Sequence, residues 1–150
     1  MAKWGRWQLP TVMRSYPHLL ALDAFIWSAY LRQAGDSILK VQYDVWVGTP
    51  VQWRPGVEPV KNQAECTSCK RIDAIFLGRD HTIHLVEIKP FGNYVAYGQV
   101  KMYRSLLLAE RPALGKIKMD IVCNKADEDI LAISKVEGIH IEQMEIHSEV

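Results

Sequence analysis

Cysteine is scarce in this 150-residue chain: the three present, Cys66, Cys69 and Cys123, are an odd number and form no obvious disulfide framework. Long apolar runs are also missing, since none approaches the roughly 20 residues needed to cross a bilayer. The amino-terminal stretch MAKWGRWQLP has no apolar core, so we expect no secretory signal there. These absences predict a cytoplasmic protein in a reducing, intracellular space, without a membrane partner.

Two familiar catalytic motifs are also missing. The sequence has no glycine-rich loop ending in a P-loop lysine, and no serine stands in a nucleophile elbow. We therefore expect neither a nucleoside triphosphate nor a serine nucleophile.

What the chain does contain is enough for one folded domain spanning residues 1–150, with 49% hydrophobic and 23% charged residues. Its net charge of +1 is unevenly distributed. Residues 127–150 hold seven of the 17 acids and one of the 18 bases, which leaves +7 on residues 1–126. A basic body suits a polyanion-binding face, although charge that merely keeps the protein soluble fits equally well.

The first third of the chain divides into an arm, a helix and a strand. The arm, residues 1–16, is aromatic and basic; it either lies along a phosphate backbone or packs its tryptophans on the domain. Apolar residues at helical spacing run from Pro17 to a stop at Gly35. An alternating strand at 38–47 precedes a long irregular connection, residues 48–70.

The remainder alternates strands and helices. We expect strands at 71–77 and 82–89 around a tight turn, a helix at 94–110, a strand at 118–123, a short helix from Asp127 and a last strand at 139–146. The resulting order, αβββαβαβ, predicts an α/β fold: a three-layer-like sandwich with a central mixed sheet flanked by helices.

Two carboxylates, Asp73 and Glu87, interrupt the apolar strands of the expected hairpin, where an unpaired carboxylate is costly to bury. If Gly78 pairs with Thr82 across a three-residue loop, Asp73 lies opposite Glu87 with the Cβ atoms about 5 Å apart. A hard divalent cation, Mg²⁺ or Mn²⁺, would relieve their repulsion. A two-residue loop would instead place the carboxylates on opposite faces.

Lys89 follows Glu87 by two residues on the same strand, so both side chains point the same way. Its amine can position or help deprotonate an attacking water and can stabilise charge in the transition state. Ile88, between them, offers its backbone carbonyl as a hard oxygen ligand.

This pattern resembles the PD-(D/E)XK nuclease superfamily, in which an aspartate precedes an E-x-K strand that is followed by a helix. On the next helix, Gln99 and Tyr103 are one turn apart and match the QxxxY pattern of RecB-type exonucleases. The resemblance covers roughly residues 17–125. It implies a restriction-endonuclease-like core and metal-dependent DNA hydrolysis, with Gln99 and Tyr103 supporting the site.

The sequence departs from the family pattern at two positions. Ile72 stands where a proline often precedes the first aspartate. Asp23 is the only acid available on the first helix, where a glutamate often serves as an additional metal ligand. Its shorter side chain reaches less far, so Asp23 is either a further ligand or an ordinary helix residue.

Several alternatives stay open. Asp73 and Glu87 can form ion pairs with Arg71 and Lys89 without any catalytic role. The protein can also be a catalytically inactive nucleic-acid-binding or assembly subunit, part of a larger nuclease, a viral machine or a mobile element. A homodimer is a further expectation. Lysines and arginines that can line a DNA groove are Lys61, Lys70, Arg71, Arg79, Lys101 and Arg104.

The spacing of Cys66 and Cys69 suits zinc or redox chemistry. A closed zinc site needs two more ligands, and neither a second CxxC nor an H-x3-5-H pattern occurs. Cys123 with His81 or His84 can complete the site only if folding brings them together, so a structural zinc ion or an adaptor role is a lesser alternative.

Overall fold

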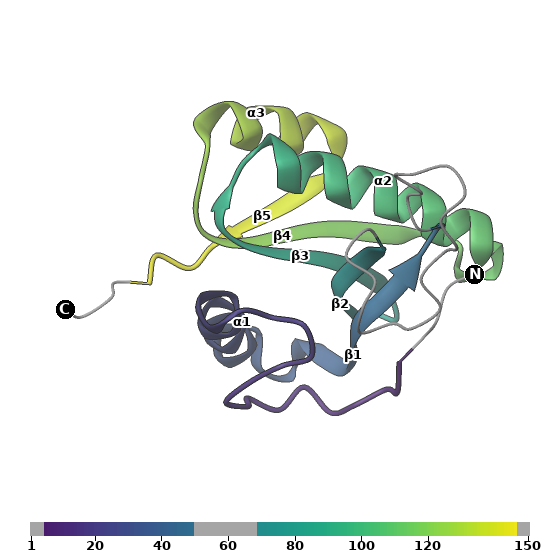
Figure 1. Cartoon of the computed structure of the whole chain (residues 1–150), viewed down its shortest axis with the longest axis horizontal. Coiled ribbons are helices and arrows are strands. Elements are labelled where there is room, and N and C mark those ends of the chain that lie inside the picture. The colour runs from purple at the N-terminus through teal and green to yellow at the C-terminus, as the bar shows by residue number, and fades with distance from the viewer. Residues whose placement is uncertain (1–4, 50–68, 147–150) are drawn as a thin grey trace, which may run out of the picture.

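The computed structural model describes residues 5–49 and 69–146. Its elements follow the expected order (Figure 1). They are α1 (Ala21–Ala34), β1 (Ile38–Val47), β2 (Lys70–Gly78), β3 (Ile83–Gly92), α2 (Tyr94–Glu110), β4 (Ile117–Ala126), α3 (Glu128–Glu137) and β5 (Ile139–Gln143), with short 3₁₀ turns at Gly35–Ser37 and Pro112–Leu114.

The five strands form one mixed sheet in the order β1-β2-β3-β4-β5. β1, β2 and β3 are antiparallel, whereas β3, β4 and β5 are parallel. α1 covers one face of the sheet, and α2 and α3 lie over the other (Figure 1). The predicted α/β class, element order and mixed sheet are therefore confirmed, and the arrangement is compatible with a restriction-endonuclease-like core.

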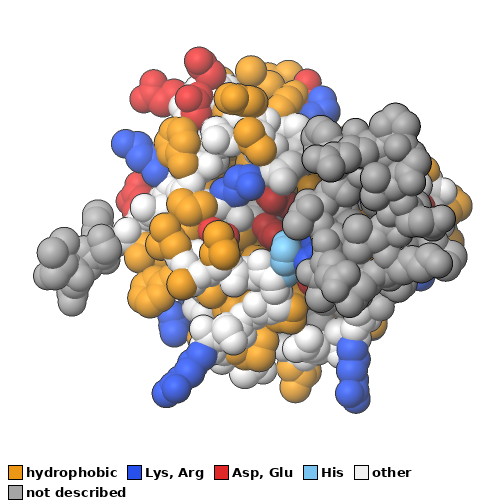
Figure 2. All heavy atoms as spheres, in the orientation of Figure 1, with side chains coloured by type: hydrophobic (Ala, Val, Ile, Leu, Met, Phe, Trp, Pro, Cys, Tyr) orange, Lys and Arg blue, Asp and Glu red, His pale blue; other side chains and the backbone are white. Residues whose placement is uncertain are grey.

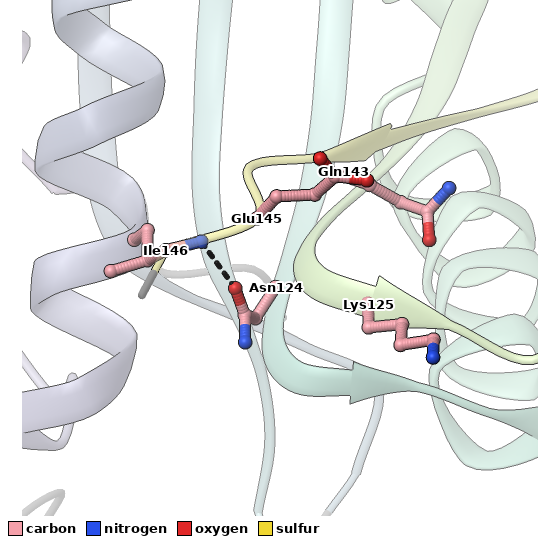
Figure 3. Close-up of a pocket in the computed structure, with 5 residues that line it drawn as sticks. All are labelled: Asn124, Lys125, Gln143, Glu145 and Ile146. Atoms are coloured by element: carbon pink, nitrogen blue, oxygen red, sulfur yellow. Dashed lines mark hydrogen bonds between the residues drawn. The ribbon is translucent and has the colours of Figure 1, made fainter. Parts of the chain in front are cut away.

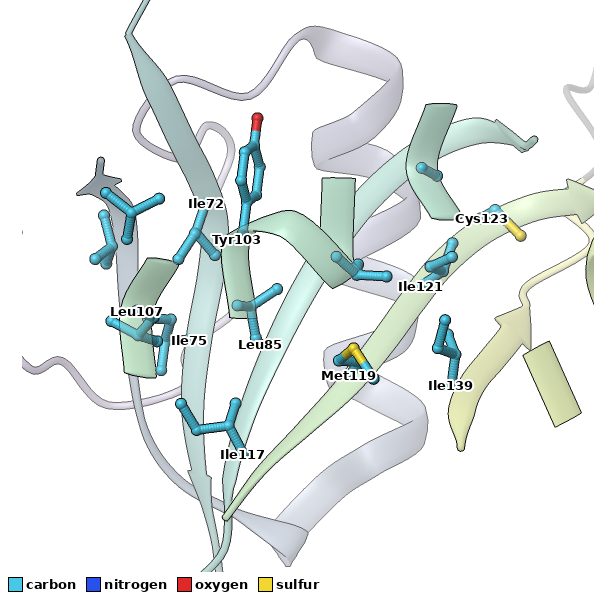
Figure 4. Packing of buried hydrophobic residues seen from close by; sticks show 14 of the residues in the cluster. Ile72, Ile75, Leu85, Tyr103, Leu107, Ile117, Met119, Ile121, Cys123 and Ile139 are labelled. Atoms are coloured by element: carbon cyan, nitrogen blue, oxygen red, sulfur yellow. The ribbon is translucent and has the colours of Figure 1, made fainter. Parts of the chain in front are cut away.

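Each face of the sheet has its own apolar core. The α1 face packs Ile26 and Trp27 against the sheet, where both are fully buried. The α2 face buries Leu107 of the helix against Leu85 and Ile121 of the strands (Figure 4). Burying these apolar side chains on both faces is the main favourable contribution to folding.

The first helix begins later than expected. Pro17 and His18 form a turn, and α1 starts at Ala21. His18 has a φ of 64°, which a right-handed helix does not accommodate. Leu22, one of the apolar residues at helical spacing, is exposed. The buried positions on α1 are Ala24, Ile26, Trp27, Ser28 and Leu31.

The alternation predicted for residues 38–47 would place Val41, Tyr43, Val45 and Val47 on one face of the strand, because side chains two residues apart point the same way. All four are buried, but the first two join the α1 core and the last two join the α2 core. Between them Asp44 has a φ of 52°, outside the extended region, and this residue interrupts the alternation that a regular strand would keep. The buried side chains of β1 therefore switch from one face of the sheet to the other next to Asp44.

The register of the β2–β3 hairpin is as predicted. The Gly78 amide donates to the Thr82 carbonyl at 2.9 Å across the three-residue loop, and Ala74 pairs with Val86. The loop closes with His81 at a φ of 63°. This three-residue loop is the one that places Asp73 and Glu87 at opposite positions of the two strands.

Other expected boundaries shift by a few residues. β4 extends to Ala126 rather than Cys123, and β5 ends at Gln143 rather than Ile146. In the amino-terminal arm, Gln8 bridges to β1 and Trp7 packs against the α2 core, so the described part of the arm lies on the domain. Most of the 48–70 connection lies outside the described residues. Among the described residues, no helix is long and apolar enough to span a membrane.

Candidate active site

The site lies where β2 separates from β3. The ladder between these strands ends at Ala74 and Val86, whereas β2 stays paired with β1 as far as Lys70. Asp73 and Glu87 are the next residues beyond the end of that ladder. The separation of the strands opens a space beside two carboxylates that the register places opposite each other.

This space is a pocket of about 490 Å³. All seven residues that the sequence predicted for the site line it, together with four others. The lining residues are His18, Leu20, Asp23, Cys69, Arg71, Asp73, Glu87, Ile88, Lys89, Gln99 and Tyr103. Residues separated by up to 85 positions in the chain therefore meet in one cavity, which lies between α1, the open end of the hairpin and α2.

Asp73 and Glu87 interact directly. The Asp73 Oδ2 atom accepts a hydrogen bond from the Ile88 amide at 2.9 Å. Burial raises the pKa of Asp73 to about 6, against the lowering effects of the Ile88 amide and of Lys89. Burial and then the charge of Asp73 raise the pKa of Glu87 well above its usual range. Burial therefore disfavours the charged form of both carboxyl groups.

Lys89 lies beside this pair, as the spacing along β3 predicted. Its Nζ atom is 3.7 Å from the Glu87 Oε1 atom, and its side chain is half-buried. The amine therefore offers a positive charge at the wall of the pocket, and it opposes the rise in the pKa of both carboxyl groups.

Gln99 and Tyr103 reach the same pocket from α2. The Gln99 Nε2 atom donates to the Tyr103 hydroxyl at 3.4 Å, a long hydrogen bond. The Tyr103 ring is buried in the α2 core while its hydroxyl points away from the apolar side chains (Figure 4). Burial raises the pKa of Tyr103, and the charges of Glu87 and Asp73 add to this effect. The tyrosine therefore stays neutral and can donate a hydrogen bond.

Asp23 also lines the pocket, from the first turn of α1. Burial raises the pKa of this carboxyl, and Lys89 lowers it. The charge of Asp23 in turn raises the pKa of Asp73, so the two groups act on each other. The first helix does supply an acid to the site, although its role as a ligand stays a prediction.

The donor set suits a hard divalent cation. The Glu87 Oε2 atom is buried and accepts no hydrogen bond within the part of the chain that the structure describes. Mg²⁺ is commonly held by one or two carboxylates, with water and substrate phosphates completing its coordination. In residues 5–49 and 69–146, no group of three or more His, Cys, Asp or Glu side chains is placed to hold a metal. A cation would therefore need water or substrate oxygens besides Asp73, Glu87 and the Ile88 carbonyl.

Two of the four unpredicted lining residues, His18 and Arg71, carry charged or titratable side chains. His18 has no motif around it, and its place in the pocket depends on the turn before α1. Arg71 was predicted as an ion-pair partner of Asp73 or as part of a DNA groove. In the structure its Nη1 atom lies 2.8 Å from His18 Nδ1, and its Nε atom lies 3.7 Å from Asp44. An arginine two residues before the first aspartate on the same strand was the available signal, because side chains at that spacing share a face.

Most other basic candidates for a DNA groove are engaged elsewhere. Lys101 pairs with Glu137, the Arg104 Nε atom donates to the Ile117 carbonyl at 3.0 Å, and Lys70 Nζ donates to the Thr49 carbonyl at 2.7 Å. Arg79 donates to the Asp36 carbonyl. Lys61 lies outside the described residues.

Of the cysteines considered for a zinc site, Cys69 and Cys123 are among the described residues. Cys69 lines the pocket and is disulfide-bonded, whereas Cys66 lies outside the described residues. Cys123 is a buried free thiol on β4, and burial raises its pKa to about 11. A structural zinc ion at Cys66 and Cys69 would require Cys69 to be reduced to a thiolate, and it stays a prediction.

A second hollow, at the ends of β4 and β5, has a different character (Figure 3). Its polar groups serve the backbone: the Asn124 Oδ1 atom accepts from the Ile146 amide, and the Gln143 Oε1 atom accepts from the Ala126 amide at 2.8 Å. Lys125 and Glu145 complete the lining. These contacts hold the chain after β5 in place and bring no acids together.

Comparison with known proteins gives little. No known family and no curated protein matches the sequence. Among solved structures, a repair endonuclease from Pyrococcus abyssi is similar, with 16% sequence identity and a TM-score of 0.42. The match covers 65% of this chain and 37% of that one, so the chain spans little more than a third of that protein. A likeness this distant carries no argument, and the proposal below rests on the site itself.

Proposed function

We propose that this protein is a divalent-metal-dependent nuclease that hydrolyses phosphodiester bonds, with DNA as its substrate. The observation that carries the proposal is the Asp73–Glu87 pair, two acids placed together in a pocket with an amine alongside. Glu87 is only 3% exposed and leaves a carboxylate oxygen without a hydrogen bond among the described residues. Holding such a pair is costly, and a bound cation with a phosphate substrate would offset that cost.

Each of the chain's own groups has a part in hydrolysis. Asp73, Glu87 and the Ile88 carbonyl would hold Mg²⁺ or Mn²⁺, which supplies charge stabilisation and a more acidic bound water. Lys89 positions the attacking water and stabilises the negative charge that develops on the phosphate in the transition state. Tyr103, neutral and linked to Gln99, donates a hydrogen bond at the pocket wall.

The experiment is a cleavage assay with linear, circular, single-stranded and branched DNA, and with RNA, in Mg²⁺ or Mn²⁺. Asp73→Ala, Glu87→Ala and Lys89→Ala should each lower the rate by about 10²-fold or more, the scale of losing an acid–base or charge-stabilising group. Circular dichroism should show that each variant is folded. Lys118→Ala, which removes an exposed lysine paired with Asp80, is the matched control and should cleave normally.

Full activity in any one of the three variants would remove that residue from the mechanism. Absence of cleavage by the unmodified protein on every substrate would overturn the catalytic proposal. The choice between internal and terminal cleavage follows from the circular substrate, which an exonuclease leaves intact.

One observation favours a second candidate, a binding or assembly subunit without turnover. Large apolar side chains are exposed just before and on α1 and at the start of α2: Leu20, which lines the pocket, is 76% exposed, Phe25 64% and Tyr94 76%. Phe91, on the adjoining hollow that shares Lys89 with the pocket, is 47% exposed. Exposed apolar surface of this kind is typical of interaction sites. Figure 2 shows hydrophobic side chains gathered beside the central carboxylates.

This candidate predicts DNA or partner binding with no hydrolysis in Mn²⁺. Gel filtration with light scattering would show whether a second copy covers the surface, because Phe91→Ser together with Tyr94→Ser would then shift a dimer to a monomer.

A further inference from the structure

His18 occupies the pocket in an unusual backbone conformation. It lies in the turn before α1 with a φ of 64°, a region that residues other than glycine adopt infrequently. Its side chain is one of the pocket's walls. Backbone strain of this kind tends to occur at functional sites. The strained turn places the His18 imidazole at the wall of the pocket.

The contact with Arg71 fixes the tautomer of His18. Arg71 Nη1 and His18 Nδ1 are 2.8 Å apart, and a guanidinium has only donors. Nδ1 must therefore accept this hydrogen bond and carries no proton of its own. In the neutral ring the hydrogen is then on Nε2, so the free side of the imidazole is a hydrogen-bond donor.

Arg71 is itself held in place. Its guanidinium lies over the Trp46 ring at 4.9 Å and beside Asp44 at 3.7 Å, and its side chain is only 11% exposed. The imidazole is therefore oriented by a rigid neighbour, and its donor edge is pre-organised rather than free to rotate.

The pocket needs donors of this kind if a phosphate is to enter it. Three acids line it, Asp23, Asp73 and Glu87, and their charge opposes a phosphodiester. Lys89 is already paired with Glu87.

We propose that His18 is a phosphate-binding residue: its Nε2–H donates a hydrogen bond to a non-bridging oxygen of a nucleic-acid phosphate in this pocket, and Arg71 is the positioning residue that sets its tautomer. The inference rests on the proposed function, because it names a contact to the same substrate. A ring with its proton on Nε2 cannot ligate a metal through that atom, which separates His18 from the cation-binding acids.

The first test measures DNA affinity without turnover. In a Glu87→Gln background, the Kd of a fluorescently labelled oligonucleotide is measured by anisotropy, single-stranded and duplex. Because a hydrogen bond to a charged group is worth about twice a neutral one, His18→Ala should raise Kd about 10-fold. His18→Gln keeps an N–H donor and should recover part of the affinity, and Arg71→Gln should weaken binding through loss of the tautomer.

His81 offers a matched control. It is likewise exposed, has a φ of 63°, and lies in the β2–β3 turn outside the pocket lining. His81→Ala removes the same side chain from the same backbone conformation, so an effect of His18→Ala through backbone strain or net charge would appear in both. The Kd of His81→Ala should equal that of the background protein.

The second test measures Mn²⁺ affinity of the otherwise unmodified protein by electron paramagnetic resonance, which His18→Ala should leave unchanged. A lower Mn²⁺ affinity in His18→Ala would make His18 a metal ligand and overturn the proposal. So would an unaltered oligonucleotide Kd. If inorganic phosphate binds with the same His18 dependence while the oligonucleotide does not, the ligand is a free phosphate and the nucleic-acid assignment fails.

These outcomes are separate from the fate of the nuclease proposal. A protein that never cleaves DNA but binds it with the expected His18 dependence would lose the catalytic assignment and keep this one. A protein that cleaves DNA with the same KM and kcat in His18→Ala would keep its activity and lose this inference. A protein that binds no oligonucleotide would lose both.

Discussion

The two ends of the β2–β3 hairpin place acids in opposite situations. At the closed end, Asp80 accepts hydrogen bonds from the Thr82 amide at 3.1 Å and the Thr82 hydroxyl at 2.6 Å. These contacts lower the pKa of Asp80 to about 2. Nearby, buried Asp120 lies 2.5 Å from His84 Nδ1, and the His84 ring stacks on Phe76.

At the open end the acids lack comparable partners. Asp73 accepts the Ile88 amide and Glu87 is 3.7 Å from Lys89, yet burial still raises the pKa of both carboxyl groups. A buried acid with matched hydrogen-bond donors stabilises the fold, whereas a buried acid that lacks them destabilises the fold until a ligand supplies the missing contacts. In physical terms the open end gives up stability that a ligand can restore.

The largest effect should come from exchanging an acid for its amide at the open end. Glu87→Gln keeps the shape of the side chain but removes the charge that a cation needs, so we expect cleavage to fall about 10³-fold. The same change removes the cost of the buried carboxylate, so the metal-free protein should unfold at higher urea concentration. A variant that lost both activity and stability would show that Glu87 has a structural role like that of Asp120.

At the closed end, removing a partner of the buried acid should lower stability and leave cleavage unchanged. His84→Ala leaves the Asp120 carboxylate buried without its nearest partner, which should lower the free energy of unfolding by about 3 kcal/mol. Urea denaturation gives this value, and cleavage per folded molecule should stay near that of the unmodified protein. His140→Ala removes an exposed histidine paired with Glu142 and should change the unfolding free energy very little.

The pH dependence of stability should also separate the two ends. A carboxyl whose pKa is raised by folding stabilises the folded state below its unfolded pKa, near 4, and loses that contribution as the pH rises through the folded value. For Asp73 the folded value is about 6. The metal-free protein should therefore lose on the order of 2 kcal/mol between pH 4 and pH 7 through this group.

Asp73→Asn isolates this contribution, because the asparagine does not titrate. The unfolding free energies of the two proteins should converge toward pH 4 and diverge toward pH 8, with the variant more stable. Mg²⁺ should remove the difference by stabilising only the unmodified protein. Parallel profiles of unfolding free energy against pH would mean that folding does not raise the pKa of Asp73.

The element order and the Asp73–Glu87 register could be predicted from the sequence because each has a local cause. The three-residue loop from Gly78 to Thr82 sets the pairing, and alternation along the strand sets the direction of Lys89. α2 runs from Tyr94 to Glu110 as predicted, and the structure adds its cap: the Asn93 side chain accepts the amides of Val95 and Ala96.

What could not be predicted depends on non-local geometry. His18 enters the pocket because its backbone is in the left-handed region, and no pattern in the neighbouring sequence predicts that conformation. β1 changes face at Asp44, which an alternating pattern of valines conceals. The separation of β2 from β3, which opens the pocket, is likewise a property of the whole sheet rather than of either strand's sequence.

The smallest expected effect concerns Tyr103, whose ring belongs to the apolar core and whose hydroxyl belongs to the pocket. Its ring is packed in the α2 core, and its hydroxyl accepts only a long hydrogen bond from Gln99 in the described structure. Tyr103→Phe should leave the unfolding free energy nearly unchanged, because the ring stays. Cleavage should fall about 3- to 10-fold, the scale of one net hydrogen bond. Tyr97→Phe, which removes a hydroxyl bonded to Lys101 outside the pocket, is the matched control. Equal rates for both variants would place the Tyr103 hydroxyl outside the chemistry and leave its ring as an ordinary part of the core.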